Sequence, residues 1–287
     1  MSSYKILTDS ACDLPASMLQ KLDVAATPLH LLFKGENIPD TVEEPAISDF
    51  YAGMRAGEVS KTTAVNPSAW EALLEPVLAD GQDALVLAFS GGLSTTHQSA
   101  VIAAQDMMEK YPDRKVLVVD TLCAASGQGL LVWYACKKRD AGMSLEQLYA
   151  WVEDNKLNLS HWFTVDDLVY LKRGGRVSAA TAVVGTMLKI KPVLHVDENG
   201  KLVSMIKARG RKAAIETLVN QMVSLGEGFD NETVFICHAD CMQDAEKLKE
   251  LVLAKTGAKE VVIGNLGAVI GSHAGPGTLA LFFMGKR

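Results

Sequence analysis

Apolar runs alternate with amphipathic stretches along most of the chain. Three short runs in the first half are almost entirely apolar: Tyr4–Thr8, Asp83–Ser90 and Lys115–Asp120. Such runs are typical of strands that are buried on both faces of a parallel sheet. Stretches with helical spacing follow them, for example Val101–Met108 and the mostly apolar Ala124–Cys136. This alternation predicts a doubly wound, mainly parallel α/β first half.

The second half combines helices with strands of a different pattern. Lys191–Val196 and Lys201–Ile206 flank Asp197–Gly200, and its Asn-Gly pair is typical of a hairpin turn. Further predicted strands are His161–Val165, Thr233–Cys237 and Glu260–Gly264, and the predicted helices are Arg211–Met222 and Asp244–Ala254. The second half is therefore predicted to be a mixed sheet with helices.

A polar stretch separates the two halves. Glu153–Asn158 is rich in charged and amide side chains, and we interpret it as a linker. A length of 287 residues also favours two domains. The predicted division is an N-terminal α/β domain of residues 1–158 and a C-terminal α/β domain of residues 159–287.

Composition narrows the function classes. Hydrophobic residues make up 48% of the chain and charged residues 22%, which excludes a mostly disordered chain. The net charge is −6 and is spread along the chain, so nucleic acid is not an expected partner. Aromatic residues make up only 6% of the chain, whereas it contains 11 Met. Any apolar cavity is therefore expected to be walled mainly by aliphatic side chains and Met.

The ends and the cysteines indicate a cytoplasmic protein. The N-terminal apolar run is too short for a signal peptide, and the apolar stretch Ile263–Met284 is interrupted too often for a membrane span. The five cysteines are scattered, as expected for reduced thiols. Cys237–Cys241 also contains His238, but no second cluster matches it, so no metal site is predicted.

Two polar loops follow predicted strands. Thr8-Asp9-Ser10 comes after the first strand, and Ser90–Thr96 lies between a strand and a helix. Ligands of open α/β sheets bind at such strand ends. The hydroxyls of Ser94–Thr96 suit helix capping and anion binding equally, and both interpretations stay open. Neither a P-loop nor a dinucleotide-binding glycine pattern is present.

Three further segments concentrate polar groups. Lys61-Thr62-Thr63 precedes a helix, where the threonines could cap it or face a pocket. Lys172–Arg176 is a basic, glycine-containing loop that suits either a solvated turn or an acidic ligand or partner. Gly271–Gly277 places His273 in a glycine-rich turn, where a buried structural His and a functional one are both consistent with the pattern.

These segments together resemble the DegV family of bacterial fatty-acid-binding proteins. The motifs that carry the resemblance follow family order over nearly the whole chain: Thr8–Ser10 with Asp13–Pro15, Lys61–Thr63, Ser90–Ser94 running to Gln98–Ala100, Leu171–Ser178 and Ile270–Gly277. The resemblance implies two α/β domains with one long-chain fatty acid in a buried tunnel between or beside them. It also implies a lipid-binding carrier of phospholipid metabolism, with no catalytic residues, cofactor or metal of its own. The carrier would present the fatty acid carboxylate to a separate ATP-dependent fatty acid kinase.

The resemblance assigns roles to individual residues. The carboxylate ligands would be Thr62 or Thr63, Ser94 and His273. The supporting loop residues would be Asp9, Ser10, Ser90, Gly91 and Gly92, and Arg173 and Arg176 would contact the kinase or support the carboxylate network. The chain departs from the family pattern at Gly91, where a Ser is usual, at His97, where an aromatic is usual, and at Thr63, which is often Ser.

Two other function classes are compatible with the residues. Ser94 and His273 could serve as nucleophile and base of a hydrolase that acts on a small ester or phosphoester. A regulatory sensor of a small molecule is the third hypothesis. For the carrier, we expect a cytoplasmic monomer, and a transient contact with a membrane is compatible with that role.

Overall fold

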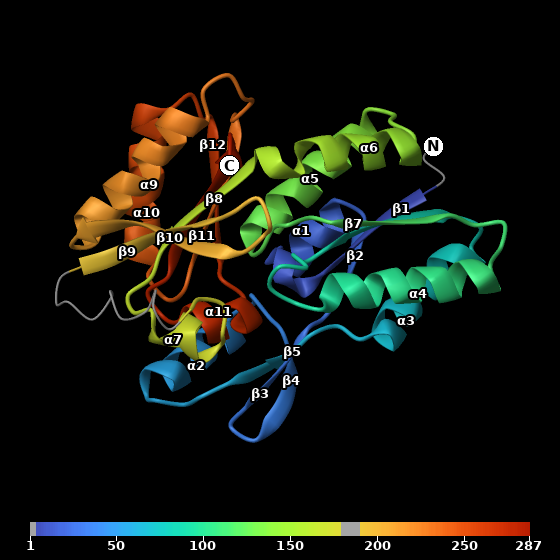
Figure 1. The fold of residues 1–287 in the computed structure, drawn as a ribbon, viewed down its shortest axis with the longest axis horizontal. Helices are drawn as coiled ribbons and strands as arrows, with labels where there is room; N and C mark the ends of the chain where they lie inside the picture. The colour runs from blue at the N-terminus through green and yellow to red at the C-terminus, as the bar shows by residue number, and fades with distance from the viewer. Residues whose placement is uncertain (1–3, 179–189) are drawn as a thin grey trace.

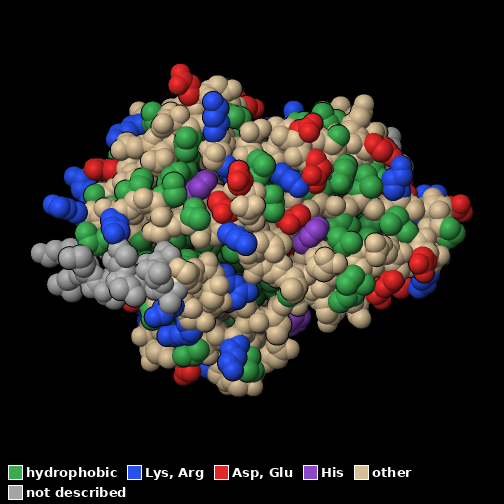
Figure 2. Space-filling view, in the orientation of Figure 1, with side chains coloured by type: hydrophobic (Ala, Val, Ile, Leu, Met, Phe, Trp, Pro, Cys, Tyr) green, Lys and Arg blue, Asp and Glu red, His purple; other side chains and the backbone are tan. Residues whose placement is uncertain are grey.

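In the computed structural model, the described residues, 4–178 and 190–287, form two large β-sheets and one small sheet with helices packed around them (Figure 1). Acidic and basic side chains are interspersed over the face seen in Figure 2. No helix in these two ranges is long and apolar enough to cross a membrane.

The first large sheet is parallel throughout. Its strands, in spatial order, are β2 (Val24–Thr27), β1 (Tyr4–Asp9), β6 (Asp83–Ala88) and β7 (Val116–Asp120). Helices α3 (Pro67–Ala79) and α4 (Thr96–Lys110) cover one face, and α5 (Ser126–Asp140) and α6 (Leu145–Asn155) cover the other (Figure 1). The shorter η1 (Ser10–Cys12) and α1 (Ala16–Lys21) follow β1. The predicted doubly wound, parallel first sheet is therefore confirmed.

The second large sheet is mixed. Its strands, in spatial order, are β10 (Leu202–Arg209), β9 (Ile190–Val196), β8 (Leu159–Thr164), β13 (Leu279–Met284), β11 (Thr233–His238) and β12 (Glu260–Asn265). Only β11 and β12 pair in parallel among these described strands. The predicted hairpin is confirmed as β9 and β10, with Gly200 at φ 70° in its turn. Helices α9 (Arg211–Leu225) and α10 (Met242–Lys255) pack on this sheet.

Helix α5 lies between the two large sheets. Ten of its 15 residues are buried, and it contacts β8, β11 and β13 of the second sheet. This double burial explains why its sequence is apolar without a clear polar face. One continuous core consequently runs from Ile6 in the first sheet to Phe282 in the second.

The small sheet was not predicted from the sequence. It consists of β4 (Glu36–Pro39), β3 (His30–Phe33) and β5 (Lys61–Thr63), which pair in antiparallel fashion. Near it lie α2 (Ala46–Arg55), α7 (Val169–Arg173) and α11 (Ala268–Ala274) (Figure 1). Helix α11 therefore joins this early segment to the end of the chain.

The stretch Glu153–Asn158, interpreted as a linker, has regular structure of its own. Its first half ends helix α6, and Lys156–Asn158 forms a 3₁₀ turn, η2, that leads directly into β8. The stretch is polar because it is a surface helix end, where Lys156 pairs with Glu153 at 2.9 Å. The chain passes from one sheet to the other at Leu159, and the division at residues 158 and 159 stays a prediction.

Candidate functional site

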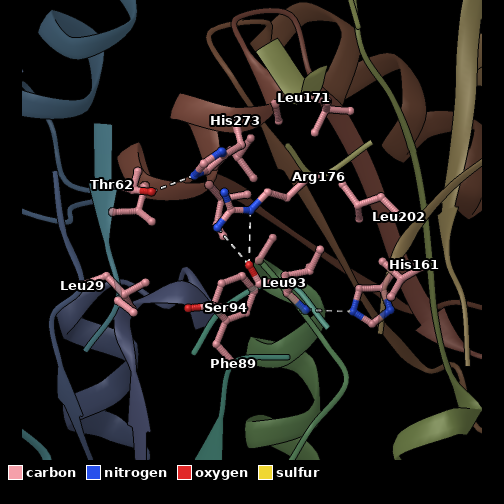
Figure 3. A pocket seen from close by; sticks show the side chains of 18 of the residues that line it. Leu29, Thr62, Phe89, Leu93, Ser94, His161, Leu171, Arg176, Leu202 and His273 are labelled. Atoms are coloured by element: carbon pink, nitrogen blue, oxygen red, sulfur yellow. Dashed lines mark hydrogen bonds between the residues drawn. The ribbon is translucent and has the colours of Figure 1, made fainter. Parts of the chain in front are cut away.

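A cavity of about 700 Å³ lies where the three sheets meet (Figure 3). Its volume is in the usual range for a small-molecule site. The loop after β6 contributes one wall, which is the position at which ligands bind to open α/β sheets. Apolar side chains that line it are Leu29, Phe89, Leu93, Phe163, Leu171, Val196, Leu202, Leu266, Val269, Ile270 and Phe282.

The wall is mainly aliphatic, as expected, but it differs from the expectation in its Met content. Three Phe residues contribute to it, and no Met is among the described residues that line the cavity. Composition averages over the whole chain, so it does not say which apolar residues face a cavity. No local sequence signal distinguishes Leu29 or Phe163 from ordinary core residues.

Polar groups gather at one side of the cavity, in a set that we call the polar corner: Thr62, Ser94, Arg176 and His273. Thr62 Oγ1 lies 2.8 Å from His273 Nε2, although 211 residues separate them (Figure 3). Thr62 comes from strand β5 and His273 from the last turn of helix α11. Burial, together with the positive charge of Arg176, lowers the pKa of His273 to about 4, so its imidazole is neutral at pH 7. Its buried Nδ1 has no hydrogen-bond partner among the described residues.

The two adjacent threonines are in different surroundings. Because they lie on a strand, their side chains point to opposite faces. Thr62 is partly buried and faces His273, whereas Thr63 is exposed and its hydroxyl donates to the carbonyl of His30 at 3.4 Å. Both line the cavity, but of the two it is Thr62 whose hydroxyl bonds His273 in the polar corner.

Ser94 both caps the first amide of helix α4 and lines the cavity. Its Oγ accepts a hydrogen bond from the Thr96 N–H at 3.2 Å, which satisfies a free amide at the start of α4. The same oxygen lies 2.9 Å from Thr96 Oγ1, and Ser94 also lines the cavity. The hydroxyl therefore engages Thr96, while His273 engages Thr62.

The two arginines occupy different positions. The Arg176 guanidinium is half-buried and donates from Nε and Nη2 to the carbonyl of Leu93, at 3.2 and 3.0 Å. It thereby holds the loop after β6 against the loop after α7, and burial lowers its pKa. Arg173 is exposed on α7 and stacks over the ring of Tyr170 at 5.5 Å. It is not one of the residues that line the cavity.

Most of the predicted supporting loop lies behind the cavity wall. Asp9 is fully buried and accepts hydrogen bonds from the amides of Ala11 and Phe89, at 3.1 and 2.8 Å. Ser10 donates to Asp40 at 2.8 Å. Neither of these two side chains lines the cavity.

The glycines of the loop after β6 are explained by close packing. Ser90 donates to the carbonyl of Gly200 at 2.9 Å, and a Cβ on Gly92 would lie 2.4 Å from the carbonyl oxygen of Asn199. A Cβ on Gly91 would lie 2.6 Å from Asp120 Oδ2, so the Ser that the resemblance places there would require the Asp120 carboxylate to shift. Gly91 lines the cavity, as does His97, whose Nδ1 is 3.9 Å from Asp120.

One cavity residue carries a polar ring that sequence reasoning missed. His161 is buried at a distance from the polar corner (Figure 3). Its Nδ1 donates to the carbonyl of Leu159 at 3.1 Å and its Nε2 accepts from the amide of Ala124 at 3.3 Å. Burial holds the pKa of His161 well below its ordinary value, so the ring is neutral.

The described ranges contain no group of three or more His, Cys, Asp or Glu side chains arranged to hold a metal ion. Cys237 and Cys241 are both free thiols, and Cys237 is buried. The sulfur of Cys241 donates to the carbonyl of Thr278 at 3.3 Å.

Comparison with known proteins gives consistent results. The sequence model of the family described as "Uncharacterised protein, DegV family" matches residues 3–286. A DegV domain-containing protein of Clostridium perfringens is 42% identical over 286 residues, which cover 99% of this chain and 98% of that protein.

Two solved structures are similar over nearly the whole chain. A DegV family protein from Thermus thermophilus, described for its fatty acid binding, is 31% identical with a TM-score of 0.88, over 98% of this chain and 99% of that one. A protein from Thermotoga maritima, whose structure is described as revealing fatty acid binding function, is 30% identical with a TM-score of 0.85, over 99% and 100%.

Proposed function

Because the chain belongs to the DegV family, we propose that it binds one long-chain fatty acid in the cavity and presents the carboxylate to a separate ATP-dependent fatty acid kinase. The observation that carries the proposal is the division of the cavity into an apolar wall and a polar corner. A fatty acid likewise consists of an apolar chain and a polar carboxylate. The fatty acid binding described for the two similar solved structures supports the proposal.

The apolar part of the cavity would supply most of the affinity. Burial of about 15 methylenes is worth roughly 12 kcal/mol before the costs of association are subtracted. Hydrogen bonds to the carboxylate add about 1.5–3 kcal/mol each, against the cost of taking the charge out of water. The polar corner would therefore set the orientation of the ligand.

In the polar corner, the hydroxyls of Thr62 and Ser94 would donate to the carboxylate, and His273 would complete the network through Thr62. The Arg176 guanidinium supplies a positive charge in the same corner. We assign Asp9, Ser10, Ser90, Gly91 and Gly92 to the support of this network rather than to ligand contact. The exposed Arg173 and its neighbours on α7 are our candidates for the kinase contact.

The contacts favour a carrier over the alternative hydrolase. A Ser nucleophile needs a base within hydrogen-bond reach. Ser94 Oγ instead bonds to Thr96, and His273 Nε2 bonds to Thr62. We therefore propose that the chain has no chemistry of its own and that the kinase supplies both ATP binding and phosphoryl transfer.

We further propose that the chain acts in the cytoplasm as a monomer, without a resident cofactor, and that its two domains divide after residue 158. The five cysteines are all free, which is consistent with a reducing compartment. The change of sheet at Leu159 supports the division.

The ligand of the purified protein tests the proposal. Protein purified from a bacterial host should release a long-chain fatty acid on solvent extraction, identified by mass spectrometry. The loaded protein should yield acyl phosphate when ATP and a purified fatty acid kinase are added, and none without the kinase. A cavity that stays empty and takes up no C14–C18 fatty acid would contradict the carrier. Ester hydrolysis by the pure protein that Ser94→Ala abolishes would establish the hydrolase instead.

A further inference from the structure

Helix α11, which carries His273, begins without a capping side chain of its own. Its N-cap residue is Gly267. A Cβ on Gly267 would lie 2.4 Å from Asp13 Oδ1 and 3.3 Å from Asp40 Oδ1, so two carboxylates occupy the space of any side chain there. A helix of seven residues is too short to be stable alone, and its first amides lack partners within the helix. The helix therefore depends on other parts of the chain.

Asp40 supplies the missing cap from the other end of the sequence. Its Oδ1 accepts a hydrogen bond from the Val269 N–H at 2.8 Å, across 229 positions of the chain. The adjacent Thr41 carbonyl accepts from the Ala268 N–H at 3.1 Å. A carboxylate at this end of a helix also interacts favourably with the helix dipole.

The same side chain reaches the opposite wall of the cavity. Asp40 Oδ2 accepts from the Ser10 hydroxyl at 2.8 Å, and Ser10 Oγ accepts from the Leu29 N–H at 3.0 Å. The Asp40 N–H donates to the Leu29 carbonyl at 2.9 Å. Because Leu29 lines the cavity, Asp40 links the wall at Leu29 to the helix that carries His273.

Of the buried acids near the start of α11, Asp40 is the one whose carboxylate accepts a hydrogen bond from an amide of this helix. Burial raises the pKa of Asp13 well above its usual value. Both Asp13 oxygens lack a hydrogen-bond partner within the described ranges. Burial raises the pKa of Asp40 only to about 6, because the Val269 amide and the Ser10 hydroxyl stabilise its charged form. Asp9, with a pKa raised to about 7, engages the Phe89 and Ala11 amides instead.

We propose that Asp40 is a positioning residue of the ligand site, which acts through helix α11 to hold His273 against Thr62. The inference rests on the proposed function of the polar corner. Val269 and His273 are four residues apart, which is about one helical turn, or 6 Å along the axis. A shift at the capped end of so short a helix is transmitted to the imidazole. This gives Ser10, which does not line the cavity, a role through Asp40.

The test compares Asp40→Ala and Asp40→Asn with Asp49→Ala, a control at an exposed acidic residue in the first turn of α2. Asp40→Ala should weaken palmitate or oleate binding by about fivefold to thirtyfold, as expected from the loss of a charged helix cap. Asp40→Asn keeps the shape and one acceptor, so it should retain more affinity. Asp49→Ala should remain within twofold of the unaltered protein.

A second readout needs no ligand. The imidazole nitrogen signals of His273, measured by NMR in the ligand-free protein, should shift in Asp40→Ala in the same direction as in Thr62→Val. If the unaltered protein binds no fatty acid, the proposed function fails, and this measurement still decides the role of Asp40.

A double-mutant cycle separates positioning from general damage. In a His273→Ala background, Asp40→Ala should cost less than about twofold in affinity. Full additivity of the two changes would overturn the proposal, as would unaltered His273 signals in a folded Asp40→Ala protein. If Asp40→Ala does not fold, Asp40→Asn decides alone, and unchanged His273 signals together with unchanged affinity would overturn the proposal.

Discussion

Helix α11 ends in two different polar environments, buried carboxylates at its N-terminal end and a neutral imidazole at its C-terminal end. At the first end, both oxygens of Asp40 accept hydrogen bonds, from the Val269 amide and the Ser10 hydroxyl. At the second end, His273 shares Nε2 with Thr62 and keeps Nδ1 without a partner among the described residues. Burial raises the pKa of Asp40 and lowers that of His273. At both ends, burial therefore favours the neutral form of the side chain.

The difference separates a structural site from a binding site. The Asp40 oxygens, whose hydrogen bonds are made within the protein, hold helix α11 in place and have little left to offer a ligand. The polar corner, in contrast, places the hydroxyls of Thr62 and Ser94, the His273 ring and the Arg176 guanidinium at the wall of a cavity. Polar side chains that line a cavity, rather than polar residues in general, mark the candidate ligand site.

The largest expected effect is an opposite pH dependence of the stability contributed by the buried acids Asp9 and Asp40 and by His273. The folded-state pKa values of Asp9 and Asp40, about 7 and about 6, exceed the ordinary value of 3.8. Their contribution is complete below about pH 4. As the pH rises it is lost at about 1.4 kcal/mol per pH unit for each carboxyl, until the loss is complete above about pH 6 for Asp40 and about pH 7 for Asp9. For His273, the pKa falls from 6.5 to about 4, so its contribution is lost as the pH drops from 6.5 to 4.

Urea unfolding between pH 4 and pH 8 measures both contributions. Asp9→Asn should flatten the loss of unfolding free energy above pH 5, whereas His273→Gln should flatten only the loss below pH 6.5. Asp49→Asn, at an exposed position, should reproduce the unaltered profile. A profile above pH 5 that Asp9→Asn leaves unchanged would contradict the assignment of a buried, proton-binding acid to Asp9.

The next effect compares the two threonines of β5. Thr62→Val removes the hydroxyl that bonds His273 and leaves the buried ring without that partner, which costs about 1–3 kcal/mol. Fatty acid affinity, measured by titration calorimetry, should fall about tenfold or more. Thr63→Val removes a hydroxyl whose bond to the His30 carbonyl is long and exposed, so affinity should stay within twofold. Equal losses at both positions would mean that the strand register does not select the ligand contact.

The smallest of the three effects is the difference between substitutions at Gly174, which lies beside His273, and at the adjacent Gly175. A Cβ on Gly174 would lie 2.1 Å from His273 Nδ1, so Gly174→Ala should push the ring from Thr62 and weaken fatty acid binding about fivefold. A Cβ on Gly175 would have no atom within 4 Å, and Asn tolerates the φ of +71° at this position better than most residues do. Gly175→Asn should therefore bind within twofold of the unaltered protein. Indistinguishable affinities of the two variants would show that the Gly174 contact does not position the ring.

Local pattern was enough to predict several parts of the molecule. The apolar runs at Tyr4–Thr8 and Asp83–Ser90 form central strands of the parallel sheet, because burial on both faces leaves few polar positions in them. The Asn-Gly turn fixed the β9–β10 hairpin, because Gly200 adopts a positive φ. In contrast, strand β13 was missed, since its pairing partners are distant in the chain. The strands of the small sheet were missed because they are only three or four residues long, too short for a clear alternation of polar and apolar positions.

By itself, the sequence determined the α/β class, the parallel first sheet, the hairpin and the polar loops that approach the cavity, because each depends on the spacing of neighbouring residues. Only the tertiary structure decided that Thr62 rather than Thr63 meets His273, that Asp9 and Ser10 lie behind the wall, and that Phe residues rather than Met line the cavity. It also brought Asp40 into hydrogen-bond contact with the first turn of the helix that carries His273. These contacts join residues up to 229 positions apart, and such contacts are set by how sheets and helices pack, which local periodicity does not encode.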